Sequence, residues 1–159
     1  MDTTEKQAMY RLMNAQLAAL VQGEHHPLPN LANAAALLWE TLPDINWAGF
    51  YVMQDGGLLL GPFQGKPACI RIPLGKGVCG TAAARDALQL VANVHEFPGH
   101  IACDSASNAE IVVPLHKNGR VVGVLDIDSP CFSRFDETDA AGLQEFAAML
   151  EQACGHMDF

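Results

Sequence analysis

The sequence predicts an α+β fold in which helices pack mainly on one face of an antiparallel sheet. Apolar residues recur at helical spacing near both ends of the chain, whereas the middle carries short strand-like runs. Asn118-Gly119 separates two apolar runs, which is typical of a two-residue hairpin turn. The order of two helices, several strands and a final helix gives the α+β layout.

Three longer helices are expected from apolar periodicity and from capping residues. The first spans residues 5–21, with apolar side chains that include Leu12 and Leu20. The second spans 31–42 and has Asn30 as its N-cap. Asp136 is the expected N-cap of the last helix, 136–154, whose apolar side chains form one face.

Between these helices the chain reads as strands separated by turn residues. Asp55-Gly56-Gly57 is the first expected turn, residues 75–81 lead into a short helix through Arg85, and 94–108 read as one irregular loop. The expected strands are 47–53, 58–60, 69–73, 88–91, 111–115 and 121–128.

Length and charge bound the possible functions. A chain of 159 residues, 50% hydrophobic and 17% charged, fits a single domain over 1–159 with its own core. Nine basic against 18 acidic residues give a net charge of −9, which argues against binding to nucleic acid or to an anionic membrane. The start lacks the pattern of a signal peptide, and no apolar run is long enough to span a bilayer, so a cytoplasmic location is expected.

Asp126 and Asp128 are the first candidate site residues. Side chains alternate along a strand, so both carboxyls point to one face while Leu125 and Ile127 point to the core. Two neighbouring carboxylates repel each other, which raises the pKa of at least one and favours a neutral acid that can donate a proton. The alternative is a solvated outer face with ordinary acids.

Glu110 could join this pair, but its position depends on the strand register. If Asn118-Gly119 is a two-residue turn, Lys117 pairs with Arg120, and Glu110 then lies opposite Ile127, on the face away from the aspartates. A bulge near Pro114 would instead bring Glu110 round to them. The sequence leaves both arrangements open.

The second concentration of reactive side chains is the loop 95–104. Cys103 is a candidate nucleophile, because a loop thiol is accessible and a nearby imidazole favours its thiolate. Two alternatives stay open. The loop could bind a metal, or its histidines and Asp104 could simply hold backbone groups. The metal ligands would be His95, His100, Cys103 and Asp104, although this set matches no familiar zinc spacing.

The other four cysteines have different settings, and the odd total of five in the chain argues against a disulfide scaffold. Cys79 is expected at a helix start, where the helix dipole lowers the pKa of a thiol. Cys69 is expected on a strand, on the face opposite Ile70 and Ile72. We interpret Cys131 and Cys154 as structural or incidental.

Trp47 and Tyr51 are four residues apart on one expected strand and therefore share a face. Aromatic side chains on strands are usually core residues. If these two face the acids instead, they form an apolar wall suited to a small ligand with one polar atom.

Together these segments resemble the GAF-domain free methionine-(R)-sulfoxide reductases. The resemblance runs from about Asn46 to the last helix and is most specific in the run Gly-His-Ile-Ala-Cys-Asp. The segments that carry it are Asn46-Trp-Ala-Gly-Phe-Tyr51, Gly75-Lys-Gly-Val-Cys-Gly-Thr81, Pro98-Gly-His-Ile-Ala-Cys-Asp104, Ser107-Asn-Ala-Glu-Ile-Val-Val-Pro114 and Gly123-Val-Leu-Asp-Ile-Asp-Ser129.

The resemblance implies a GAF fold with a six-stranded sheet, a homodimer, and thioredoxin as the reductant. It implies that Cys103 is the nucleophile, that Cys69 is the principal resolving cysteine, and that Cys79 is an alternative one. The implied substrate pocket contains Trp47, Tyr51, Glu110, Asp126 and Asp128. No organic cofactor or metal is implied. Two rival functions remain: a GAF sensor that binds a small ligand without catalysis, and a metal-binding redox protein.

Overall fold

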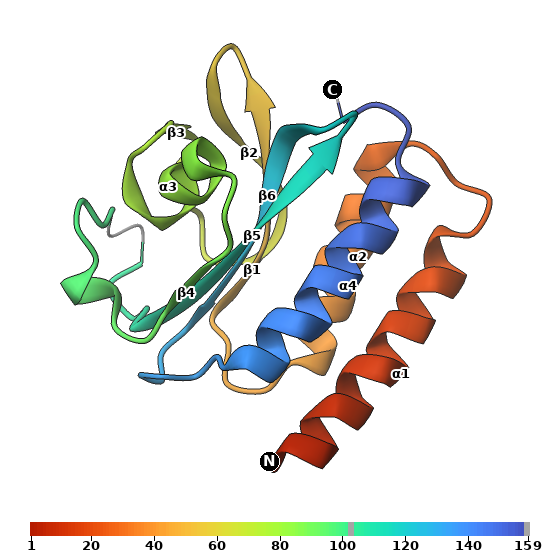
Figure 1. Cartoon of the computed structure of the whole chain (residues 1–159), viewed down its shortest axis with the longest axis horizontal. Coiled ribbons are helices and arrows are strands. Elements are labelled where there is room, and N and C mark those ends of the chain that lie inside the picture. Colours follow the sequence, from red (N-terminus) through yellow and green to blue (C-terminus); the bar gives the residue numbers. More distant parts are fainter. Residues whose placement is uncertain (102–103, 158–159) are drawn as a thin grey trace.

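A six-stranded antiparallel sheet forms the centre of the computed structural model, which describes residues 1–101 and 104–157 (Figure 1). The strand order is β3-β2-β1-β6-β5-β4. The helices are α1 Thr3–Val21, α2 Pro27–Thr41, α3 Gly77–Arg85 and α4 Glu137–Ala153, with a 3-10 turn at Val94–Glu96. The strands are β1 Trp47–Gln54, β2 Gly57–Gly65, β3 Arg71–Pro73, β4 Gln89–Val91, β5 Ala109–Lys117 and β6 Arg120–Ser129.

The sheet separates two unequal layers (Figure 1). Helices α2 and α4 pack against one face, and α1 packs on these two helices from outside. Helix α3 lies on the opposite face, where it contacts β3, β4, β5 and β6. The expected α+β fold with helices mainly on one face is therefore confirmed.

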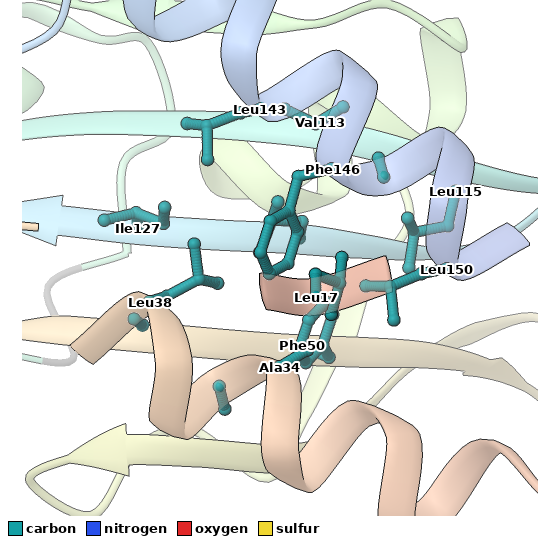
Figure 2. Packing of buried hydrophobic residues seen from close by; sticks show 14 of the residues in the cluster. Leu17, Ala34, Leu38, Phe50, Val113, Leu115, Ile127, Leu143, Phe146 and Leu150 are labelled. Atoms are coloured by element: carbon teal, nitrogen blue, oxygen red, sulfur yellow. The ribbon is translucent and has the colours of Figure 1, made fainter. Parts of the chain in front are cut away.

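The main core lies between the sheet and the larger helical layer. Figure 2 shows Phe146 of α4 above the sheet, with Ile127, Leu38 and Phe50 around it. These side chains are fully buried. Full burial of such a side chain stabilises the fold by about 1.5–3 kcal/mol, so this layer supplies much of the stability.

The last helix begins where the sequence predicts. Asp136 accepts hydrogen bonds from the backbone N–H groups of Thr138 and Asp139, and the Asp139 side chain accepts one from the N–H of Asp136. This reciprocal capping box satisfies backbone donors that a helix start leaves without partners.

The start of α2 differs from the prediction. The helix begins at Pro27, its N-cap is His26, and Asn30 is a buried residue inside the first turns. Proline is well suited to a first helical position, because its missing N–H would have no partner there and its φ is already helical. The Asn30 side chain donates to the carbonyl of Glu24 instead of capping.

Two further expectations are wrong in detail. Leu12 and Leu20 of α1 are exposed, so the apolar pattern of this helix is wider than its buried face. Strand β3 begins at Arg71, so Cys69 and Ile70 precede it, and Ile70 is 66% exposed. In the described residues, no helix combines the length and the apolar character needed to cross a membrane.

Both predicted hairpin turns are confirmed. Asp55 and Gly56 have φ of 52° and 80°, and Asn118 and Gly119 have φ of 54° and 73°. Two successive positive φ angles are the signature of a type I′ turn, which matches the twist of the flanking strands.

Candidate functional site

A cavity of about 50 Å³ lies on the face of the sheet that carries α3. Strands β1, β5 and β6 supply its floor, α3 supplies one side, and parts of the segments 66–72 and 100–107 supply the rest. Its lining includes two aromatic residues, one cysteine and three acids: Trp47, Tyr51, Cys79, Glu110, Asp126 and Asp128.

A bulge in the β5–β6 hairpin brings Glu110 into this site. Lys117 pairs with Arg120 as the turn predicts, but the register shifts between Leu115 and His116. Glu110 consequently lies opposite Asp128 instead of Ile127. A shift of one residue moves a side chain to the other face of a sheet, so this bulge decides between the two arrangements that the sequence left open.

The three carboxyl groups are withdrawn from solvent. Glu110 is 7% exposed and Asp126 5% exposed, and one oxygen each of Asp126 and Asp128 (both Oδ1) is buried without a hydrogen-bond partner. Burial raises the pKa of all three groups, and the charge of Asp126 raises the pKa of Glu110 and Asp128 further. The alternative of a solvated outer face is therefore wrong.

Hydrogen bonds of Glu110 with Asp126 and Asp128 change the pKa of all three groups. Hydrogen bonding with Asp126 and Asp128 raises the pKa of Glu110, while the same bonds with Glu110 lower the pKa of the two aspartates. Each acid thus affects the protonation of its neighbours, and the pKa of all three stays raised. The cluster can present a neutral acid and an anion to one ligand atom.

Trp47 and Tyr51 form an aromatic wall beside the acids. Their ring centroids are 5.9 Å apart, and Trp47 also stacks on Phe63 at 5.1 Å. The Trp47 Nε1–H donates to the carbonyl of Lys66 at 3.2 Å, and the Tyr51 hydroxyl donates to the carbonyl of Cys69 at 2.8 Å. Both residues are buried, line the cavity and fix the segment that carries Cys69.

The expectation that the pKa of the Cys79 thiol is lowered is wrong. Cys79 is the third residue of α3, but it is buried, and its Sγ lies 3.9 Å from Glu110 Oε2. Burial raises the pKa of this thiol, and the charges of Asp126 and Glu110 raise it further. Burial and the surrounding acids together therefore outweigh the effect of the helix start on the pKa of Cys79.

Cys103, the predicted nucleophile, lies outside the described residues. The described residues on either side of it along the chain, Ile101 and Asp104, both line the cavity. Cys69 is disulfide-bonded, whereas Cys131 and Cys154 are free thiols away from the cavity.

The predicted metal site in the loop gains no support from the side chains that the structure describes. His95 Nε2 lies 2.8 Å from Asn108 Oδ1, and Asp104 accepts a hydrogen bond from the backbone N–H of Ala106. His95, His100 and Asp104 do not form a group of possible metal ligands within the described ranges. These contacts match the alternative in which loop side chains hold backbone and neighbouring groups.

Sequence reasoning gave Asn46 no role, although it anchors this loop. Its Nδ2 donates to Asp104 Oδ2 at 3.1 Å and to Ser107 Oγ at 3.0 Å. Its position just before β1, inside one of the recognised motifs, was the only available signal. Lys66 and Lys76 also line the cavity without having been predicted, and His100 lines it although it was named only as a possible metal ligand.

Comparison with known proteins agrees with this geometry. The GAF domain model matches residues 7–154. The chain belongs to the GAF-domain family. It is 53% identical over 154 residues to the free methionine-R-sulfoxide reductase of Escherichia coli, covering 97% of this chain and 93% of the relative.

Solved structures place this GAF domain among the same relatives. The reduced form of the Staphylococcus aureus protein fRMsr is 50% identical, with a TM-score of 0.89 over 91% of this chain and 94% of that one. The free methionine-R-sulfoxide reductase of Neisseria meningitidis in complex with its substrate is 46% identical, with a TM-score of 0.91 over 96% and 90%. The resemblance that the motifs indicate is confirmed.

Proposed function

We propose that this GAF domain reduces free methionine-(R)-sulfoxide to methionine. The observation that carries the proposal is the cluster of three buried carboxyl groups of raised pKa against the aromatic wall. A sulfoxide oxygen is a poor leaving group until it is protonated, and a neutral acid can supply that proton. Relatives of 53% and 46% identity that are named for this activity support the assignment.

The substrate binds with its sulfoxide oxygen towards the acids. One of Glu110, Asp126 and Asp128, kept neutral by its neighbours, donates to that oxygen, and all three residues line the cavity. Trp47 and Tyr51 hold the S-methyl group by apolar contact. The remaining negative charge of the cluster can also attract the ammonium group of a free amino acid.

The chemistry proceeds on sulfur. The Cys103 thiolate attacks the sulfoxide sulfur while the oxygen takes up two protons and leaves as water, so that an S–S bond joins Cys103 to the methionine sulfur. Water then attacks the Cys103 sulfur, the S–S bond breaks with its electron pair going to methionine, and Cys103 becomes a sulfenic acid. The Cys69 thiol then condenses with it, releasing water and forming a disulfide, which is recycled by two electrons from the dithiol of thioredoxin.

Cys79 is the alternative resolving thiol in this scheme. Neither an organic cofactor nor a metal takes part in the reaction.

The proposal also includes a homodimer and a cytoplasmic location. The family resemblance implies the homodimer, and the sequence pattern favours the cytoplasmic location; light scattering and cell fractionation test them.

A coupled assay tests the function. Protein, thioredoxin, thioredoxin reductase and NADPH are mixed with free methionine-(R)-sulfoxide or its S epimer, and NADPH consumption is followed. We expect turnover with the R epimer, none with Cys103→Ser, and unchanged turnover with Cys131→Ser, a change at an exposed cysteine outside the cavity. Sulfoxide binding without loss of any thiol would identify a sensor instead of an enzyme.

A further inference from the structure

One group of three side chains at the end of the cavity has the composition of a metal site. Cys79, Glu110 and Asp126 each offer a ligand atom, and these atoms all lie within 4.8 Å of one another. All three residues are buried. They come from α3, β5 and β6, so the fold itself brings them together.

The donor set and its spacing suit a small thiophilic cation. In a tetrahedral Zn²⁺ site, bonds of about 2.3 Å to sulfur and 2.1 Å to oxygen separate the two ligand atoms by about 3.6 Å. Cys79 Sγ and Glu110 Oε2 are 3.9 Å apart, so only a small shift is needed. A thiolate ligand favours Zn²⁺ or Cd²⁺ over Mg²⁺ or Ca²⁺, which prefer oxygen ligands alone.

A separate observation shows that one carboxyl oxygen of this cluster lacks a partner. Asp126 is 5% exposed, lines the cavity, and has its Oδ1 buried without a hydrogen bond. In the part of the chain that the structure describes, no salt bridge joins Glu110 or Asp126 to a basic side chain. A buried carboxylate oxygen without a partner is costly, and a cation would satisfy it.

We propose that Cys79, Glu110 and Asp126 bind a divalent cation of the Zn²⁺ class. The Cys79 thiol and any protonated carboxyl of the pair release their protons to solvent, and the sulfur forms a bond to the metal beside the two carboxylates. The metal takes the oxygens that would otherwise meet a sulfoxide, so it excludes the substrate. This inhibition rests on the proposed reductase function, whereas the binding does not.

Cd²⁺ is a direct probe, because its bond to a thiolate produces a charge-transfer absorption in the ultraviolet. The full chain is reduced with a non-thiol reductant and titrated with Cd²⁺. We expect binding at one site, lost in Cys79→Ser and weakened at least about tenfold in Asp126→Asn. Cys131→Ser and Cys69→Ser should bind as the wild type does. Thermal melts of each variant check that it is folded.

The competing hypothesis is a metal site that uses Cys69 in place of Cys79. If the absorption persists in Cys79→Ser but disappears in Cys69→Ser, the metal binds elsewhere and the proposal is wrong. A folded wild type with no Cd²⁺ absorption would also overturn it.

Inhibition is measured separately, as methionine released in a single turnover by pre-reduced protein with and without Zn²⁺. We expect Zn²⁺ to suppress this release in the wild type and in Cys131→Ser. A protein that releases no methionine but binds Cd²⁺ contradicts the function and not the site. A protein that releases methionine equally well with Zn²⁺ contradicts the inhibition.

Discussion

At the scale of single residues, Cys69 and Cys79 differ in how easily their sulfur can react. Cys69 lies in an irregular segment, partly buried, and its own carbonyl is held by the Tyr51 hydroxyl. Cys79 is fixed in a helix among acids, where its thiol stays protonated. Since the thiolate is the reactive form, Cys69 is better placed to resolve a sulfenic acid.

We therefore predict that Cys69→Ser releases methionine in a single turnover and then stalls with thioredoxin. Cys79→Ser should lose far less of the steady-state rate. The measurement is the burst and the steady state of methionine formation, with disulfides mapped by mass spectrometry after one exposure to substrate. A stall in Cys79→Ser with continued turnover in Cys69→Ser would reverse the two roles.

The limit of sequence reasoning is visible in single residues of the site. Alternation along a strand was enough to put Trp47 on the same face as Tyr51, and Asp126 on the same face as Asp128, because a strand has a fixed period. The register of β1 against β6 then decides that the two pairs share one face. Glu110 could not be placed, because a bulge outside the turn shifts the register by one residue. The acidic surroundings of Cys79 were missed since they come from strands distant in sequence.

At the scale of elements, the contact between α1 and α4 depends on one glycine. A Cβ added at Gly142 would lie 2.3 Å from Tyr10 Cγ, far too close for any real contact. The same approach lets the Tyr10 hydroxyl donate to the buried Asp139 at 2.7 Å. Glycine is intrinsically poor in a helix, so its use here reflects the close packing of the two helices.

We predict that Gly142→Ala lowers the free energy of unfolding by about 1–3 kcal/mol, because the added methyl overpacks the contact. Gly155→Ala is the control, since its Cβ would meet only the carbonyl of His25 at an ordinary 3.7 Å. Denaturant unfolding measures both. A stabilised Gly142→Ala would show that helix propensity outweighs the clash.

His116 connects elements from both layers. Its ring contacts Asp86, which caps α3, and Glu151 of α4. The hydrogen bond with Asp86 raises the pKa of His116, burial opposes this, and Glu151 raises the pKa further. A raised pKa in the folded state gives stability that is complete below the ordinary value and is lost as pH rises through the folded value.

We predict that His116→Gln destabilises the protein at acidic pH and has less effect at alkaline pH. The side chain is 38% exposed, so solvent screening keeps the expected loss to about 0.5 kcal/mol. His156→Gln, at an exposed histidine, is the matched control. Denaturant midpoints measured across the pH range decide the matter, and an effect of equal size at every pH would exclude the ionic origin.

Whether a helix start could be predicted also depended on whether its cause is local or distant in the sequence. The start of α4 was predictable because Asp136 and Asp139 cap it within three residues. The start of α2 was not, because Asn30 has the chemistry of a cap but is buried against Cys154 at the far end of the chain. Local sequence thus gave the helices and hairpins, while packing between distant segments set their ends.

At the scale of the whole molecule, the two faces of the sheet differ in what they bury. The face under α2 and α4 buries apolar side chains, whereas the face under α3 combines a smaller apolar cluster with Glu110, Asp126 and Asp128. Burial raises the pKa of these acids, so the folded protein binds their protons more tightly than the unfolded chain does. Unfolding then releases protons, and the free energy of unfolding falls as pH rises from about 4 towards neutrality.

The substitution Asp126→Asn tests whether the buried acids lower the free energy of unfolding at neutral pH. The amide keeps the shape of the carboxyl but cannot ionise, so we predict a free energy of unfolding about 1 kcal/mol higher at neutral pH. We also predict a flatter dependence on pH between about 4 and 7. Asp55→Asn is the control, because it makes the same chemical change in an exposed turn where asparagine fits the positive φ. Denaturant unfolding across the pH range measures both slopes. If the slope of Asp126→Asn matched that of the wild type, the buried acids would not be what holds the extra protons, and the neutral donor on which the proposed reduction depends would have no thermodynamic support.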